Sequence, residues 1–175
     1  RIAVLYARYQ ETLRAYQAMD FDDLIRLPVD LFNQFPEALL RWQQRLRYIL
    51  VDEYQDTNAC QYQLMKLLAG PRAALTAVGD DDQSIYAWRG ASTANIQNLQ
   101  NDYPNLKVVK LEQNYRSSQR ILQSANHLIK NNTKLFDKNL WSEHGLGDQV
   151  RIFAAKDEEH EAESVVLRLL AHKFE

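Results

Sequence analysis

The sequence predicts an α/β protein in which short, mostly parallel strands alternate with amphipathic helices. Short apolar runs, most of them rich in β-branched residues, lie at 48–51, 74–78, 106–111 and 150–154, and apolar residues at helical spacing fill the segments between them. Such alternation is typical of an open sheet with parallel strands. The composition agrees, because 46% hydrophobic and 25% charged residues are values of a globular protein.

Three helices are predicted before the first strand. Apolar and aromatic residues recur at helical spacing over 2–16. Asp20 can cap a second helix, with Asp23 three residues later in the position of a capping partner. Pro28 is expected to kink or end that helix, and Pro36 suits the first position of a third one.

The first strand, 48–51, is predicted to be short and fully buried, and it runs directly into Asp52 and Glu53. In an open parallel sheet, ligands bind beyond the carboxyl ends of the strands, so these acids stand where a ligand would bind. One carboxylate can hold Mg²⁺ and the other can position and deprotonate a water. A plainer interpretation is a strand-to-helix turn in which Asp56 or Thr57 caps the next helix.

The rest of the chain continues the alternation. A boundary between two lobes is expected near 110–114. The part before the expected boundary predicts a helix that stops at Gly70, a buried strand at 74–78, a loop at 79–91, a short helix begun by Thr93 and a strand at 106–111. The part after it predicts a helix begun by Ser117, an irregular connector at 133–149, a strand at 150–154 and a final amphipathic helix.

Further acids follow the second strand, at Asp80, Asp81 and Asp82, and two chemistries would use them together with the first pair. A nucleotide triphosphatase needs a Mg²⁺ ligand, a water-positioning group and cations that face the γ-phosphate. A two-metal nuclease needs several carboxylates around shared metals. Gln83, Arg89 and Arg116 favour the nucleotide triphosphatase, because they can orient a water or bind phosphate. A solvated acidic turn at 80–82 remains the simplest alternative.

Aromatic residues in the polar loops raise a second question. Tyr86 and Trp88 are two residues apart, a pattern that suits stacking on unpaired bases, although core packing is the commoner fate of tryptophan. For Tyr115 and Arg116 the sequence also leaves two interpretations open. The tyrosine can stack on a flat base while the arginine reaches a phosphate, or the tyrosine can simply pack under the start of a helix, with the arginine at its surface.

Global properties exclude some classes. A net charge of −2 gives no overall signal for nucleic acid, so that interpretation must rest on local residues. The single cysteine, Cys60, rules out an internal disulfide framework and fits a reducing, cytoplasmic setting. No apolar run has membrane-spanning length. No Gly-Lys pair occurs, so the phosphate-cradling loop G-x-x-x-x-G-K-[ST] is missing, and we expect the chain to be a fragment.

Three segments together resemble motifs II, III and IV of superfamily 1 DNA helicases of the UvrD, Rep and PcrA type. They are VDEYQDTN at 51–58, GDDDQSIYAWRG at 79–90 and LEQNYRSS at 111–118, in the family's order and approximate spacing. DFDDLI at 20–25 is similar to the family's Ib region, and 135–143 and 157–163 lean toward the Rep branch. The resemblance covers nearly the whole chain.

The resemblance implies roles at the nucleotide. Asp52 would help to hold Mg²⁺, and Glu53 would activate the attacking water. Gln83 would contact the γ-phosphate and link it to the DNA groove. Tyr115 would stack on adenine, and Arg116 would reach the γ-phosphate from the second lobe.

At the DNA, the resemblance implies that Tyr86 and Trp88 meet single-stranded bases, with Arg89 between the DNA and nucleotide sites. Its implied fold is the end of the helical 1B region at 1–19, the later part of a RecA-like P-loop NTPase lobe, 1A, at 20–110, and the start of a second RecA-like lobe, 2A, at 111–175.

The function implied by the resemblance is that of an ATP-dependent 3′-to-5′ DNA helicase, with ATP and Mg²⁺ as cofactors and single-stranded DNA and single-strand/duplex junctions as substrates. Replication or repair proteins are expected partners, with no membrane. Motif I, motifs V and VI and the 2B region are absent, so the isolated chain is expected to be inactive. A nucleic-acid-binding module with a decayed ATPase stays the main alternative, and a metal-dependent nuclease is the third.

Overall fold

The computed structural model describes residues 2–173 and divides into two compact units, each described here by itself. The first unit is Arg1–Val109 with Asn132–Asp137, and the second is Lys110–Asn131 with Lys138–Glu175. Residue 1 and residues 174–175, the outermost positions of the first and last predicted segments, lie outside the described residues.

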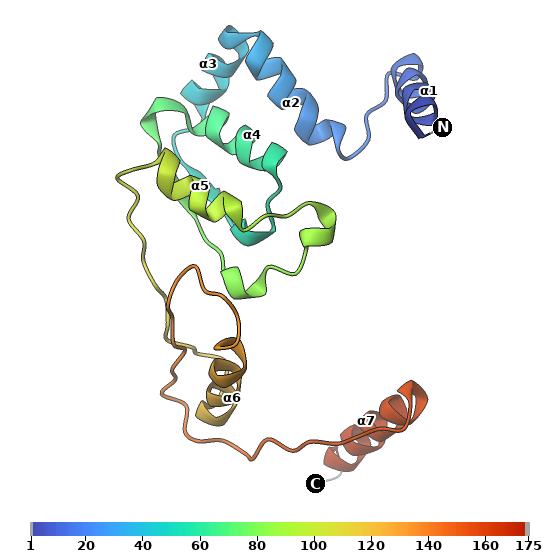
Figure 1. Ribbon diagram of the computed structural model, residues 1–175, viewed down its shortest axis with the longest axis vertical. Coiled ribbons are helices and arrows are strands. Elements are labelled where there is room, and N and C mark those ends of the chain that lie inside the picture. The colour runs from blue at the N-terminus through green and yellow to red at the C-terminus, as the bar shows by residue number, and fades with distance from the viewer. Residues whose placement is uncertain (1, 174–175) are drawn as a thin grey trace. The chain divides into compact units, whose positions relative to one another are not determined.

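The first unit is a mixed α/β structure with a small parallel sheet, which confirms the predicted class. Its elements are α1 (Ile2–Ala15), α2 (Asp23–Gln34), α3 (Pro36–Arg45), β1 (Ile49–Val51), η1 (Tyr54–Asp56), α4 (Ala59–Ala69), η2 (Gly70–Arg72), β2 (Leu75–Ala77), η3 (Asp81–Gln83), η4 (Ala87–Arg89) and α5 (Ala94–Asp102). The strands pair in parallel, with Leu50 opposite Thr76. Helices α2, α3 and α4 pack on one another (Figure 1).

Local side-chain chemistry sets the start of α2. Asp20 Oδ1 accepts a hydrogen bond from the Asp23 backbone N–H (2.8 Å), and Asp23 Oδ2 accepts one from the Asp20 N–H (3.4 Å). Of the two outcomes predicted at Pro28, a kink or an end, the end is wrong, because α2 continues to Gln34. Proline removes one helical hydrogen bond, but the next turns bury Val29 and Phe32, and that packing holds the helix together.

The helix that follows β1 is capped by Asn58, and neither Asp56 nor Thr57 supplies the cap. Asn58 Oδ1 accepts from the Gln61 N–H and Gln61 Oε1 accepts from the Asn58 N–H, both at 2.9 Å. These reciprocal bonds satisfy two backbone donors that a helix start otherwise leaves unpaired. Since Asn58 provides the cap, the acids just before it are not needed to begin α4.

The core of the first unit lies between the sheet, α4 and α5, where Tyr54, Tyr62, Met65 and Leu99 are buried together. The Tyr62 hydroxyl donates to Asp102, and the Lys66 ammonium lies 2.7 Å from the same carboxylate. The ammonium of Lys66, with the tyrosine hydroxyl, holds the pKa of Asp102 below its usual range. This cluster fixes α5 against α4.

The two strands are less buried than the sequence predicts. Leu50 is 72% exposed, and Tyr48 and Val78, predicted as strand residues, are exposed and lie outside the three-residue strands. Side chains alternate across a strand, and here only the face with Ile49 and Val51 packs against the rest of the unit. The predictions of a fully buried first strand and a buried second strand are therefore wrong.

The second unit contains α6 (Gln119–Ile129) and α7 (Glu158–His172). The predicted strands at 106–111 and 150–154 do not form within residues 2–173. An extended segment becomes a strand only where a neighbour completes its ladder, and these runs have no such neighbour in the described chain. The nearest pairing is an isolated bridge between Gln113 and Trp141.

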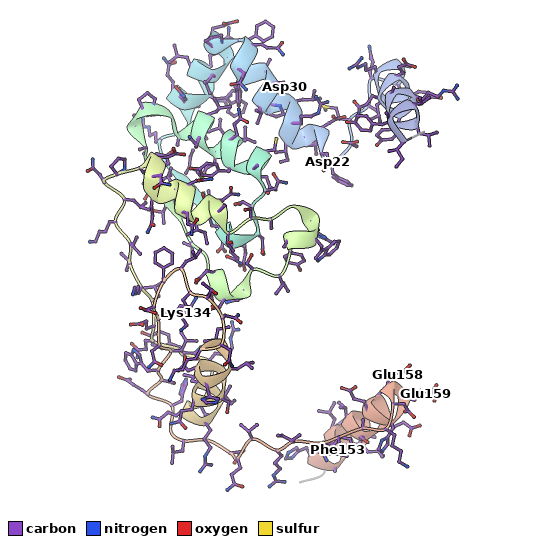
Figure 2. The ribbon with its side chains drawn as sticks, in the orientation of Figure 1. Asp22, Asp30, Lys134, Phe153, Glu158 and Glu159 are labelled. Carbon is purple, nitrogen blue, oxygen red and sulfur yellow. The ribbon has the colours of Figure 1, made fainter. Side chains whose placement is uncertain are left out.

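The segment predicted as the fourth strand instead contacts the helix that follows it. Figure 2 shows Phe153 beside α7. The guanidinium of Arg168 lies 4.7 Å from the centre of the Phe153 ring, and the His160 ring lies 5.7 Å from it, edge to face. Asp157 caps α7 by accepting from the His160 N–H at 2.8 Å. Across residues 2–173, every helix is too short or too polar to cross a bilayer.

Candidate functional site

Both acids of the first predicted pair are exposed at the carboxyl end of β1. Asp52 Oδ1 accepts a hydrogen bond from the Glu53 backbone N–H at 2.9 Å. Glu53 adopts a left-handed backbone conformation with φ of 50°, which is uncommon for a residue with a side chain. Such conformations cost free energy and persist only where neighbouring contacts enforce them.

The second group of acids follows β2, which lies beside β1. Val78 N–H donates to Val51 O (2.8 Å) and Tyr54 N–H donates to Val78 O (2.9 Å), so the two strand ends leave the sheet together. Asp80 then accepts from the Asp82 N–H (3.1 Å) and from Gln83 Nε2 (2.7 Å). The side chain of Gln83 is thus held by Asp80 at the same edge of the sheet as the first pair of acids.

Carboxylates of Asp80, Asp81 and Asp82 have ligand atoms within 4.8 Å of one another, the one such group in the described chain. Asp52, the residue predicted to hold Mg²⁺, is outside this group. Its exposed carboxylate nevertheless has the chemistry that Mg²⁺ takes when it binds through one or two carboxylates together with substrate phosphates and water.

Tyr86, Trp88 and Arg89 form an exposed aromatic and cationic cluster in the first unit. Trp88 is 74% exposed, so the core interpretation left open by the sequence does not hold. The two rings lie 6.4 Å apart, and the Arg89 guanidinium stands 4.6 Å from the centre of Trp88 and 5.3 Å from that of Tyr86. A solvent-facing indole beside a cation can stack on a nucleobase.

Asn95, which the sequence interpretation did not single out, connects this loop to the acids of β1. Its side chain is buried and Nδ2 donates to Thr57 O (2.8 Å) and to Thr57 Oγ1 (3.2 Å). The Ser92 N–H also donates to Thr57 O at 3.2 Å, and Tyr54 Oη donates to Asn95 O at 3.1 Å. The end of the aromatic loop is thereby attached to the turn that follows Glu53.

Tyr115 and Arg116 belong to the second unit, in an exposed turn before α6. Asn114 Oδ1 accepts from the backbone N–H groups of Arg116 (2.9 Å) and Ser117 (2.7 Å). The cap position of α6 is Ser118, one residue later than predicted, because Ser117 is engaged in the Asn114 turn. Within the described chain, the guanidinium of Arg116 makes no hydrogen bond or ion pair.

The backbone of this turn is attached to the later part of the second unit. Asn114 N–H donates to Trp141 O (2.7 Å), Trp141 N–H donates to Glu112 O (3.0 Å), and the His144 ring bonds Tyr115 O (2.8 Å). Tyr115 itself is 76% exposed and its hydroxyl donates to Gln113 Oε1 at 2.8 Å. Both predicted side chains therefore stand on a braced turn, open to a ligand.

Comparison with known proteins identifies the class. Residues 1–104 match the UvrD/REP helicase N-terminal domain, and residues 109–174 match the UvrD-like helicase C-terminal domain. The chain belongs to the UvrD/Rep helicase family, as the three motifs indicated.

Individual relatives agree with this assignment. The chain is 56% identical to ATP-dependent DNA helicase Rep of Escherichia coli (strain K12), over 97% of this chain and 25% of that protein. It is 50% identical to ATP-dependent DNA helicase PcrA of Leuconostoc citreum, over 94% of this chain and 22% of that protein. The chain is also 47% identical to ATP-dependent DNA helicase Rep of Buchnera aphidicola subsp. Acyrthosiphon pisum (strain APS), over 97% of this chain and 26% of that protein. The chain thus spans about a quarter of the length of these relatives.

Proposed function

We propose that this chain is the central part of an ATP-dependent DNA helicase that moves 3′ to 5′ along single-stranded DNA and unwinds duplex at a junction. What supports the proposal is one arrangement: the Glu53 carboxylate and the Asp80 backbone N–H, which follow adjacent parallel strands, both form hydrogen bonds with the side chain of Gln55. Family membership and the exposed aromatic loop agree with it.

In this proposal residues 1–19 end region 1B, residues 20–110 are the later part of a RecA-like lobe 1A, and residues 111–175 begin the RecA-like lobe 2A. These bounds follow the motifs and differ slightly from those of the two compact units, because 132–137 belong to the first unit. ATP and Mg²⁺ are the cofactors, and Mg²⁺ supplies neutralisation of phosphate charge when it is bound. The enzyme works in the cytoplasm, with replication or repair proteins as partners.

Five side chains act on the nucleotide. Asp52 is a Mg²⁺ ligand, and Glu53 orients the attacking water and accepts its proton. Gln83 leaves Asp80 to meet the γ-phosphate, an exchange of one hydrogen-bond acceptor for another. Tyr115 stacks on the adenine, and Arg116 donates its planar fork to the γ-phosphate.

Three side chains act on DNA or between the two ligands. Tyr86 and Trp88 stack on unpaired bases, and Arg89, which stands over both rings, also serves the nucleotide. A base that stacks on the ring face covered by Arg89 would displace the guanidinium, because the two cannot occupy the same face.

The direction of movement is tested with the purified helicase that contains this segment. We expect ATP-dependent unwinding of a duplex with a 3′ single-stranded tail and little unwinding of a matched duplex with a 5′ tail. A gel assay with labelled strands measures both. Preference for the 5′ tail would contradict the direction, and DNA binding without any ATP hydrolysis would favour the binding-module alternative.

Substitution Trp88→Ala tests the stacking role. Loss of one base stack should weaken single-strand binding by about 1–3 kcal/mol and reduce DNA-stimulated ATPase. Because Trp88 is 74% exposed, the melting temperature should change little. Fluorescence anisotropy with a labelled oligonucleotide and a thermal melt measure the two effects.

Trp42 on α3 offers a matched control, because it is also exposed (44%) and has the Arg45 guanidinium 5.1 Å from its ring centre. Trp42→Ala should leave DNA affinity unchanged. Equal losses of affinity in both variants would remove the special role of Trp88.

A further inference from the structure

Gln55 is a buried polar side chain next to the proposed catalytic acid, and no role has been assigned to it above. It lies in η1, and its 1% exposure makes it the one side chain below 2% among residues 2–173. A carboxamide this deeply buried is costly unless its donors and acceptor are satisfied. The partners of Gln55 therefore matter for what it does.

Its two ends bind the two strand-end segments. Nε2 donates to Glu53 Oε2 at 2.8 Å and lies 3.5 Å from Asp56 Oδ2, while Oε1 accepts from the Asp80 backbone N–H at 3.0 Å. Carboxylates accept and a backbone N–H donates, so only this orientation of the amide satisfies all three partners.

The surrounding structure is built closely around this side chain. A Cβ on Gly79 would stand 2.8 Å from Gln55 Oε1, so the strand end approaches the amide only because residue 79 is glycine. The Ser84 hydroxyl donates to Gln55 O at 3.4 Å, which adds a second link to the acidic loop.

We propose that Gln55 is a positioning residue that holds the Glu53 carboxylate in its working orientation and braces it against the backbone of Asp80. This inference rests on the proposed function, in which Glu53 is the general base. An exposed glutamate samples many rotamers, whereas the bond from Gln55 fixes one oxygen and leaves the other for water. The left-handed backbone of Glu53 carries a local cost in free energy, which this bond helps to offset.

Other residue types cannot do both tasks. Leucine has a similar size but would leave the Asp80 N–H without its acceptor. Glutamate would keep that acceptor but would turn a second carboxylate toward Glu53 and Asp56. Asparagine is shorter by one methylene and could not span from Glu53 to Asp80.

Steady-state ATPase with saturating single-stranded DNA tests the proposal in the whole helicase that contains this segment. We expect Gln55→Leu to lower kcat by about 10- to 100-fold, the range typical of residues that orient a catalytic group. The KM for ATP should change by less than about threefold, because Gln55 is buried and is not among the side chains proposed to bind the nucleotide. Gln61→Leu is the matched control, since Gln61 loses a capping bond in the same segment but has no contact with Glu53; its kcat should stay near that of the unaltered enzyme.

A double-mutant cycle separates positioning from folding. In a Glu53→Gln background, adding Gln55→Leu should leave the residual single-turnover rate unchanged, because there is no general base left to orient. A further loss equal to that in the unaltered background would assign Gln55 to the fold and overturn the proposal. Unaltered kcat in Gln55→Leu would overturn it as well.

If Gln55→Leu shows no melting transition, Gln55→Glu takes its place, because it has the same length and keeps the acceptor for Asp80. It should reduce kcat while ATP binding remains, and kcat like that of the unaltered enzyme would overturn the proposal. Failure of the proposed function looks different: in that case Glu53→Gln would itself retain ATPase. Loss in Glu53→Gln with no effect at Gln55 contradicts the positioning role alone.

Discussion

Glu53→Gln in the whole helicase is expected to lower the ATPase kcat by about 10²- to 10⁴-fold, the usual contribution of a general base. Glutamine keeps the length and shape of the side chain, and its amide oxygen can still accept the hydrogen bond from Gln55 Nε2. It cannot take a proton from water. Because the geometry is preserved, the affinities for nucleotide and for single-stranded DNA should remain close to those of the unaltered enzyme.

Phosphate release measures kcat, and equilibrium binding of a fluorescent nucleotide measures affinity. Glu37→Gln is a suitable control, because Glu37 is also exposed but lies in the first turn of α3, away from the acids of β1. Near-normal turnover in Glu53→Gln would transfer the role of base to another acid, with Asp80 the first to test because it follows the adjacent strand at the same edge of the sheet.

Features that depend on neighbouring residues in the chain were predictable. The start of α2 follows from Asp20 and Asp23, whose reciprocal hydrogen bonds need only three residues of separation. The start of α3 is also a local feature, because the fixed φ of Pro36 suits the first position of a helix. The parallel pairing of β1 and β2 was also expected, from the helix between them.

Features that depend on distant partners were not predictable. The run at 106–111 has the composition of a strand, but its backbone finds no ladder within the described chain. Gln55 shows the same limit at the site. One of its three hydrogen-bond partners is the Asp80 N–H, 25 residues away, and no local pattern distinguishes Gln55 from an ordinary polar residue of a turn.

In the candidate site, too, some features were predictable from the sequence and others were not. The position of the acids at one edge of the sheet could be predicted, because parallel strands bring their carboxyl ends together. Exposure decided between alternatives that the sequence left open, since Trp88 faces solvent. Asn95 and Asn114 escaped notice because asparagine is common in loops, and only their contacts with Thr57 and Arg116 distinguish them.

Arg116→Ala is expected to lower the ATPase kcat by about 10³- to 10⁵-fold, the range of an arginine that stabilises charge on a transferring phosphoryl group. ADP affinity should change little, because ADP has no γ-phosphate for the guanidinium to meet. Lysine should restore little activity, since a point charge does not reproduce the planar fork. Steady-state phosphate release with excess single-stranded DNA, together with ADP titrations, measures these effects.

The position of Arg116 itself favours a functional role. A cation near the start of a helix is unfavourable next to the positive end of the helix dipole, and Arg116 precedes α6 in just this way. Within the described chain its guanidinium has no acid or carbonyl to compensate, whereas Arg120 nearby donates to Gly147 O at 2.6 Å. Arg120→Ala is therefore the matched control: it removes one positive charge from the same helix start and should leave kcat within about twofold. Turnover like that of the unaltered enzyme in Arg116→Ala would remove this arginine from the mechanism, and equal losses in both variants would reduce its role to general electrostatics.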